Sequence, residues 1–140
     1  MINFFFEEVE VKIKEEQIAS WIRSVIDSET KKEGEISFIF CTDDYLLKLN
    51  QQFLSHDTFT DIISFDNSMG NELHGEIYIS VERVEENATV FNQEGQEELR
   101  RVIIHGVLHL CGYKDKTEEE SSFMRVKENE KLAMFHVEHS

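Results

Sequence analysis

The sequence predicts an α+β fold in which a small mixed β-sheet packs against helices. Two observations predict this class. Short segments rich in β-branched and aromatic residues alternate with longer segments whose apolar residues recur at helical spacing. The 140 residues include no proline, six glycines and no repeated or Ser-rich stretch, so nothing marks a linker. We therefore expect a single domain over residues 1–140.

The first half of the chain predicts extended segments that alternate with helices. Residues 3–6, followed by apolar residues that alternate with charged ones up to Ile13, predict an opening extended segment. A helix is expected from Glu15 or Glu16 to about Thr30, because its apolar residues form one face. Residues 35–42, EISFIFCT, predict a strand. Thr42 or Asp43 can then cap a helix that carries Tyr45, Leu46, Leu49 and Phe53.

The second half predicts two strands and then three helices. Strands are expected at 62–65 and 76–80, with a loop over 66–75 that contains Asn, Ser and Gly. Ser80 can cap a helix over 81–92. Residues 97–111 are apolar nearly all round, which predicts a helix inside the domain. A last helix is expected from Thr117 to about Val137, because Thr117 and Glu120 have capping-box spacing.

Composition excludes several classes of protein. No apolar run approaches the roughly 20 residues that span a bilayer, and no signal peptide is recognisable, so we expect no membrane contact. Cys41 and Cys111 are too few for a disulfide scaffold, which predicts free thiols in the cytoplasm. The formal net charge of -15 argues against broad nucleic-acid binding, so any such contact must be local.

The segment around His105 contains the candidate metal site. His105 and His109, at i and i+4, share one helix face, and Gly112 can leave the helix with a positive φ. The chain can then turn back so that Asp115 offers a carboxylate as a third ligand. Two imidazoles and one carboxylate suit one zinc ion and leave a fourth position for water, as in catalytic sites. The alternative is two ordinary histidines before a helix stop, but the combined spacing favours metal binding.

This spacing matches the metzincin protease signature, except that Gly106 stands where the proteases have their Glu general base. The nine positions from His105 to Tyr113 also fit the signature H-G-x-L-H-L-x-G-Y-D-H of the YbeY family of metal-dependent endoribonucleases. Residues 49–65 and 75–80 resemble two further motifs of that family. The chain departs from the family at Lys114 and Asp115, where the family has Asp and then a third His, and at Leu54, which replaces an arginine.

The resemblance implies a zincin-like metal helix and a single-strand-specific endoribonuclease that acts in ribosomal RNA maturation. Its partner would be ribosomal RNA or a ribosomal subunit. A water activated by the zinc ion held by His105, His109 and Asp115 would attack a phosphodiester. The resemblance also implies that His56 lies in a loop near the cleft.

Four basic residues flank the metal motif and are candidates for contacting RNA phosphates: Lys114, Lys116, Arg100 and Arg101. His56 is a further candidate. Ion pairs with neighbouring glutamates are the alternative for the two arginines. Two other functions stay open on the residues alone. One is a metalloprotease or other metallohydrolase, favoured by the ligand spacing and opposed by Gly106. The other is a ribosome assembly factor with a structural metal, with which the net charge agrees.

Overall fold

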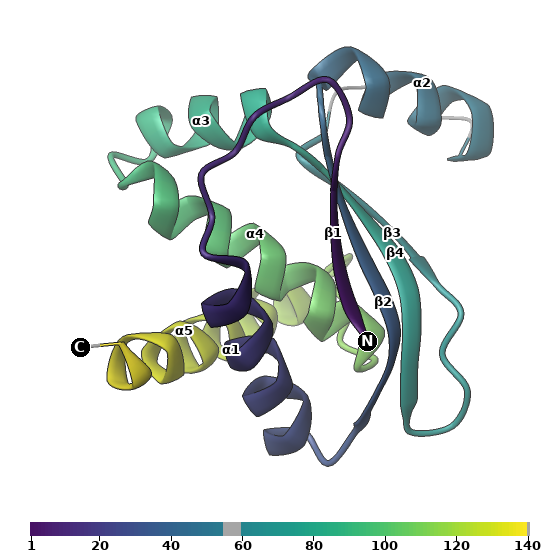
Figure 1. Ribbon diagram of the computed structural model, residues 1–140, viewed down its shortest axis with the longest axis vertical. Coiled ribbons are helices and arrows are strands. Elements are labelled where there is room, and N and C mark those ends of the chain that lie inside the picture. Colours follow the sequence, from purple (N-terminus) through teal and green to yellow (C-terminus); the bar gives the residue numbers. More distant parts are fainter. Residues whose placement is uncertain (55–59, 140) are drawn as a thin grey trace.

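A computed structural model describes residues 1–54 and 60–139 of the chain. Helices and strands follow one another along it in the order that the sequence predicts (Figure 1). In chain order, the elements are β1 (Ile2–Phe6), α1 (Glu15–Ser28), β2 (Lys32–Cys41), α2 (Asp43–Leu54), β3 (Ile62–Asp66), β4 (Glu72–Ser80), α3 (Val81–Val90), α4 (Gly95–Leu110) and α5 (Glu118–Glu138).

The four strands form one sheet in the order β1-β2-β4-β3. β1 pairs with β2 and β2 with β4 in parallel, whereas β3 and β4 form an antiparallel pair. The predicted mixed sheet is therefore confirmed. Because parallel neighbours need a crossover connection, α1 joins β1 to β2 on the helical side of the sheet (Figure 1).

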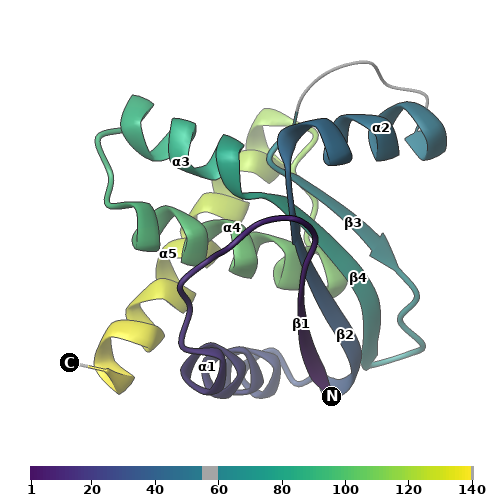
Figure 2. The same cartoon turned by 45° about the horizontal axis from the view of Figure 1, so that its top comes forward.

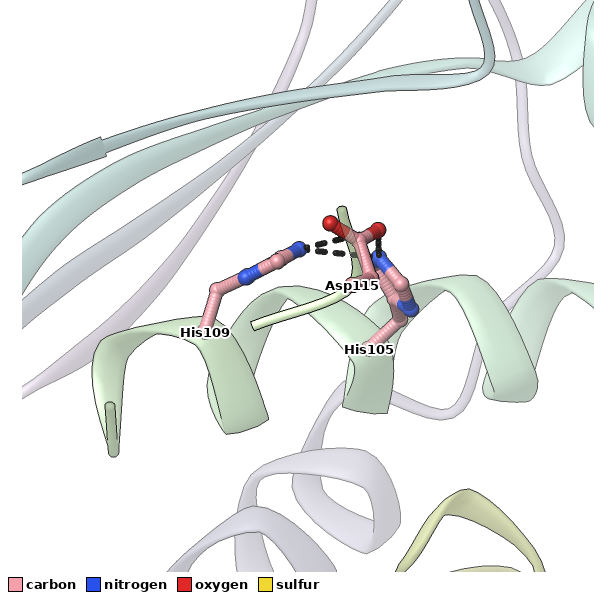
Figure 3. A group of neighbouring side chains, drawn as sticks. All are labelled: His105, His109 and Asp115. Atoms are coloured by element: carbon pink, nitrogen blue, oxygen red, sulfur yellow. Dashed lines mark hydrogen bonds and ion pairs between the residues drawn. The ribbon is translucent and has the colours of Figure 1, made fainter. Parts of the chain in front are cut away.

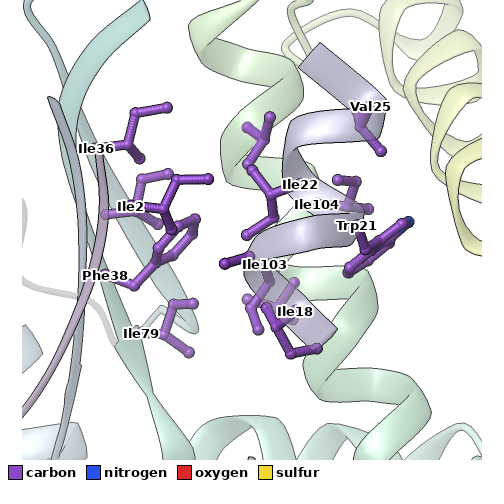
Figure 4. Packing of buried hydrophobic residues seen from close by; sticks show 14 of the residues in the cluster. Ile2, Ile18, Trp21, Ile22, Val25, Ile36, Phe38, Ile79, Ile103 and Ile104 are labelled. Carbon is purple, nitrogen blue, oxygen red and sulfur yellow. The ribbon is translucent and has the colours of Figure 1, made fainter. Parts of the chain in front are cut away.

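The main core lies between one face of the sheet and the helices α1 and α4. Phe38, Ile36 and Ile79 from the strands face Ile22 and Ile103 from the helices, and all five are fully buried (Figure 4). α4 is buried on most of its surface, as its nearly continuous apolar sequence predicts. This packing holds the helix of the candidate metal site rigidly against the sheet.

A smaller cluster covers part of the opposite face. Leu46 of α2 packs there with Cys41 and Ile63, and α2 crosses one end of the sheet (Figure 2). Cys41 and Cys111 are both free thiols. Among residues 1–54 and 60–139, no helix is long and apolar enough to cross a membrane.

The predicted helix caps are confirmed. Ser80 Oγ accepts a hydrogen bond from the Arg83 amide at 3.1 Å, and Thr42 Oγ1 accepts one from the Tyr45 amide at 3.1 Å. At the start of α5, Thr117 and Glu120 form both hydrogen bonds of a capping box, each at 3.0 Å. These side chains satisfy amides that lack partners within the helix.

Two expectations about extended segments are corrected. The opening strand ends at Phe6: Glu8 has a φ of 57°, and the apolar residues up to Ile13 pack against the main core without joining the sheet. The loop expected over 66–75 is shorter, because β4 begins at Glu72, where it pairs with Lys32 of β2, a strand that also begins earlier than expected. Backbone pairing between distant strands, not the residue types in the loop, decides this boundary.

Candidate metal centre

Three side chains from the end of α4 and the turn after it converge on one point (Figure 3). The Nε2 atoms of His105 and His109 lie 3.0 Å apart. Asp115 Oδ2 lies 3.1 Å from Nε2 of His105 and 3.4 Å from Nε2 of His109. The i, i+4 spacing on a buried helix thus brings both imidazoles to one face, as the sequence predicts.

Gly112 allows the chain to return towards the histidines. Its φ is +107°, in the region that favours glycine, and its amide donates to the His109 carbonyl at 3.0 Å. The Tyr113 amide donates to the Leu108 carbonyl at 3.1 Å, which completes the turn. Asp115 follows two residues later and is carried back over the helix (Figure 3).

The hydrogen bonds of the other ring nitrogens define which atoms face the centre. His109 Nδ1 lies 2.9 Å from the Tyr113 carbonyl oxygen, and His105 Nδ1 lies 2.6 Å from Glu128 Oε2. A carbonyl and an ionised carboxylate only accept, so each Nδ1 carries a proton. In the neutral rings, both Nε2 lone pairs then face each other and the Asp115 carboxylate. Only a cation, either a proton or a metal ion, relieves that arrangement.

The donor set fits a metal ion. Atoms bound tetrahedrally at about 2.0–2.1 Å from one zinc ion are separated by roughly 3.3 Å. The three separations here are 3.0, 3.1 and 3.4 Å. His105, His109 and Asp115 therefore could hold one ion and leave a further position open.

Glu128 of α5 contacts His105 at Nδ1, the ring nitrogen that faces away from the other candidate ligands. Its side chain is only 6% exposed, and its Oε1 accepts from Arg101 at 3.0 Å. Burial would raise the pKa of Glu128, but the hydrogen bonds from His105 and Arg101 outweigh burial and lower it. Burial would likewise lower the pKa of His105, yet the hydrogen bond to Glu128 and the negative charges of Glu128, Asp115 and Asp61 together outweigh burial and raise that pKa. The pair thus fixes the ring of His105 in place.

The metal centre opens into a cleft of about 1390 Å³ between α4, α5 and β3. Asp61 and Glu98 line it as well, and burial raises the pKa of each carboxyl. Glu98 Oε2 has no hydrogen-bond partner among the described residues. The basic residues that line the described cleft are Arg101, Lys116 and Arg125.

Only some of the candidate RNA-contacting residues line the cleft that the described residues form. Arg101 and Lys116 line the cleft. Lys114 is exposed on the same loop but does not line the cleft formed by the described residues. Arg100 also lies outside that lining: its guanidinium contacts Glu97 at 3.1 Å and the Phe135 ring at 4.5 Å, which is the ion-pair alternative. His56 lies outside the described residues.

Sequence reasoning missed Glu128 and Arg125, and it assigned no role to Asp61. One signal for Glu128 was available, because it lies at helical spacing from the apolar residues Met124, Leu132 and Phe135, which are buried. A glutamate on a buried helix stripe indicates a buried polar partner. Arg125 and Asp61 carry no such signal, because only the tertiary structure brings them to the cleft.

Gly106 lies where α4 approaches the sheet most closely. A Cβ atom there would lie 2.9 Å from Cγ2 of Ile77 and 3.1 Å from Cδ1 of Ile62. The side of α4 on which a metzincin carries its general base is therefore packed against β4 and β3. This position has no room for a glutamate side chain.

Fold and site together define a class: an α+β protein with a candidate His-His-Asp metal centre in an open cleft. The family model described as Endoribonuclease YbeY matches residues 3–136. A protein named Endoribonuclease YbeY from Christiangramia forsetii is 61% identical over 137 residues, covering 98% of this chain and 96% of that protein. One of the same name from Flavobacterium psychrophilum is 59% identical and covers 98% of both.

A solved structure is also similar. The solution structure of TM1509 from Thermotoga maritima has a TM-score of 0.71 and 30% sequence identity, and the match covers 99% of this chain and 91% of that one. The expected fold class is confirmed. The chain belongs to the YbeY endoribonuclease family.

Proposed function

We propose that this protein is a zinc-dependent, single-strand-specific endoribonuclease of ribosomal RNA maturation, with His105, His109 and Asp115 as the ligands of one ion. Family membership supplies the general activity, endonucleolytic hydrolysis of RNA. We add the metal, the ligands and the ribosomal substrate, either ribosomal RNA or a ribosomal subunit. The two free thiols support a cytoplasmic location.

The main observation that supports this proposal is the convergence of three ligand atoms. Both Nε2 lone pairs and one carboxylate oxygen lie within 4.8 Å of one another at the edge of a cleft. The chemistry that a bound zinc ion supplies is Lewis acidity, which lowers the pKa of a coordinated water towards 7 and polarises a phosphoryl oxygen. No side-chain general base is then required on α4.

The residues of the chain orient the metal ligands and bind the RNA. Glu128 and the Tyr113 carbonyl each retain the Nδ1 proton of one histidine, so both Nε2 atoms stay free to bind. Arg125 and Lys116 line the cleft, where they could contact RNA phosphates, whereas the Arg101 guanidinium is paired with Glu128. RNA contact by a chain with a net charge of -15 must rely on such local cations, because the carboxylates of Asp61, Glu98 and Glu128 also line the cleft.

The metalloprotease alternative loses its support at Gly106. The structure of α4 leaves no space for the glutamate base that this chemistry uses. The assembly-factor alternative, in which the metal is structural, remains an outcome of the experiment.

Elemental analysis and RNA cleavage test the proposal together. We expect near-stoichiometric zinc in the wild-type protein, and loss of zinc and of cleavage in His105→Ala and Asp115→Ala variants that stay folded by circular dichroism. His136→Ala is the matched control. His136 lies near the C-terminal end of α5, is 55% exposed and pairs with Glu97 of α4. The substrate is a single-stranded ribosomal RNA fragment beside its duplex form.

Each other outcome has a definite meaning. Zinc lost only from the His105 variant would require another third ligand. Zinc bound without RNA cleavage, together with binding of ribosomal subunits by the folded metal-free double variant, would favour the assembly factor. Cleavage of casein without cleavage of RNA would contradict the endoribonuclease.

A further inference from the structure

We infer that Tyr113 and Glu29 form an anchor that positions His109 and the loop carrying Asp115. The inference rests on the proposed metal site and goes beyond it, because neither residue is a ligand. Tyr113 follows the positive-φ Gly112, and Glu29 lies at the end of α1, 84 residues earlier in the chain.

Tyr113 makes contacts at both of its ends. Its carbonyl oxygen lies 2.9 Å from Nδ1 of His109, and its phenol hydroxyl donates to Glu29 Oε1 at 2.5 Å. The ring between them lies 5.8 Å from the Phe123 ring. Displacement of the ring therefore moves the carbonyl that orients His109.

Glu29 is itself held by two lysines of α5. Its Oε2 lies 2.8 Å from Nζ of Lys127 and 2.8 Å from Nζ of Lys131. The Lys131 side chain is 1% exposed and also donates to Ser28 Oγ at 2.9 Å. A charge buried this deeply is strongly tied to its partners, because an unpaired buried ion is costly. The Tyr113 hydroxyl is thus attached to a rigid junction of α1 and α5.

The loop after Tyr113 has little else to position it. Residues 114–117 are exposed and belong to no helix or strand, and a Cβ at Gly112 would meet no described atom within 4 Å. Asp115 must nevertheless stay within about one ligand separation of both histidines. Its position is set by the ends of the loop, at Tyr113 and at the capping box of Thr117.

Tyr113 acts through other residues and is a positioning residue. It does not line the cleft that the described residues form, so RNA does not reach its hydroxyl there. Residues that orient a metal-binding histidine typically contribute 10- to 100-fold to metal affinity. The anchor should accordingly affect metal affinity and turnover, and leave RNA binding unchanged.

Tyr113→Phe tests the anchor, because it removes one oxygen and keeps the ring. We expect the zinc dissociation constant, measured by competition with a chelator, to rise about 10-fold. At subsaturating zinc, kcat should fall in proportion while KM for RNA stays constant. Tyr45→Phe is the matched control, since Tyr45 is exposed on α2 and stacks on Tyr78 away from the metal centre.

Glu29→Ala provides a second variant at the other end of the contact, because it removes the carboxylate that accepts from the Tyr113 hydroxyl. Its effect on zinc affinity should be at least that of Tyr113→Phe, and adding Tyr113→Phe to it should cause no further loss, because the hydrogen bond of the Tyr113 hydroxyl is already broken. Additive losses would overturn the anchor, as would a Tyr113→Phe affinity within twofold of the wild type. A wild-type protein that binds zinc but cuts no RNA contradicts the proposed function and leaves the affinity test decisive. Absence of zinc binding overturns both.

Discussion

Glu128 Oε2 lies 2.6 Å from Nδ1 of His105, although 23 residues and a helix-to-helix turn separate the two in sequence. The same carboxylate accepts from Arg101 through its other oxygen at 3.0 Å. One buried acid thus orients a candidate ligand and neutralises a guanidinium that lines the cleft. This relationship makes α5 part of the metal centre without supplying a ligand.

Glu128→Gln should weaken metal binding while the fold is kept. The amide oxygen can still accept from His105, but the negative charge that favours the ring's orientation and balances Arg101 is lost. We expect an affinity loss of about 10-fold, from equilibrium dialysis against zinc. Glu119→Gln, exposed on the same helix, should have no effect. An equal loss in both variants would mean that overall charge, and not the contact, is responsible.

Gly106→Ala should destabilise the protein. The added methyl would lie 2.9 Å from Ile77 Cγ2 and press α4 away from the sheet, at a cost of about 1–3 kcal/mol. The better helix propensity of alanine returns only up to about 1 kcal/mol. Urea denaturation of the metal-free protein measures the difference. Gly95→Ala is the control, because a Cβ there would meet no described atom within 4 Å and should leave stability unchanged or higher.

Stability should fall in acid through Glu29. Burial would raise the pKa of this carboxyl, but hydrogen bonds from Lys127, Lys131 and Tyr113 outweigh burial and lower the pKa to about 2. A lowered folded-state pKa contributes stability above the unfolded value of 4.5, and the contribution disappears as the pH falls towards 2. The free energy of unfolding of the wild type should exceed that of Glu29→Gln by up to about 3 kcal/mol at neutral pH. Denaturant titrations from pH 7 to pH 2 should show that difference shrinking, and a constant difference would contradict the assignment.

The salt dependence of RNA binding should identify the phosphate contacts. Arg125 and Lys116 line the cleft, so replacing either with alanine should raise KM and lower the slope of log affinity against log salt by about 0.7, the value for one phosphate of a single strand. Lys114→Ala is the control on the same loop, because Lys114 does not line the described cleft. Equal slopes for the Lys114 and Lys116 variants would show that only general charge matters.

The sequence by itself determined the local features. The i, i+4 histidines, the glycine that ends α4, the capping box at Thr117 and the apolar character of α4 depend on short-range spacing, which the sequence displays directly. The mixed sheet followed from the alternation of strand and helix patterns. The candidate ligands His105, His109 and Asp115 lie within eleven residues, so their convergence was predictable.

Only the tertiary structure decided what surrounds them. Glu128, Asp61 and Arg125 reach the cleft from other elements, and nothing in their local sequence distinguishes Arg125 from an ordinary surface arginine. The Glu29–Tyr113 contact likewise spans 84 residues. The extension of β4 back to Glu72 depends on its register with Lys32. These features arise from pairing and packing between distant segments, whose energies depend on the neighbours that folding supplies and not on the residue alone.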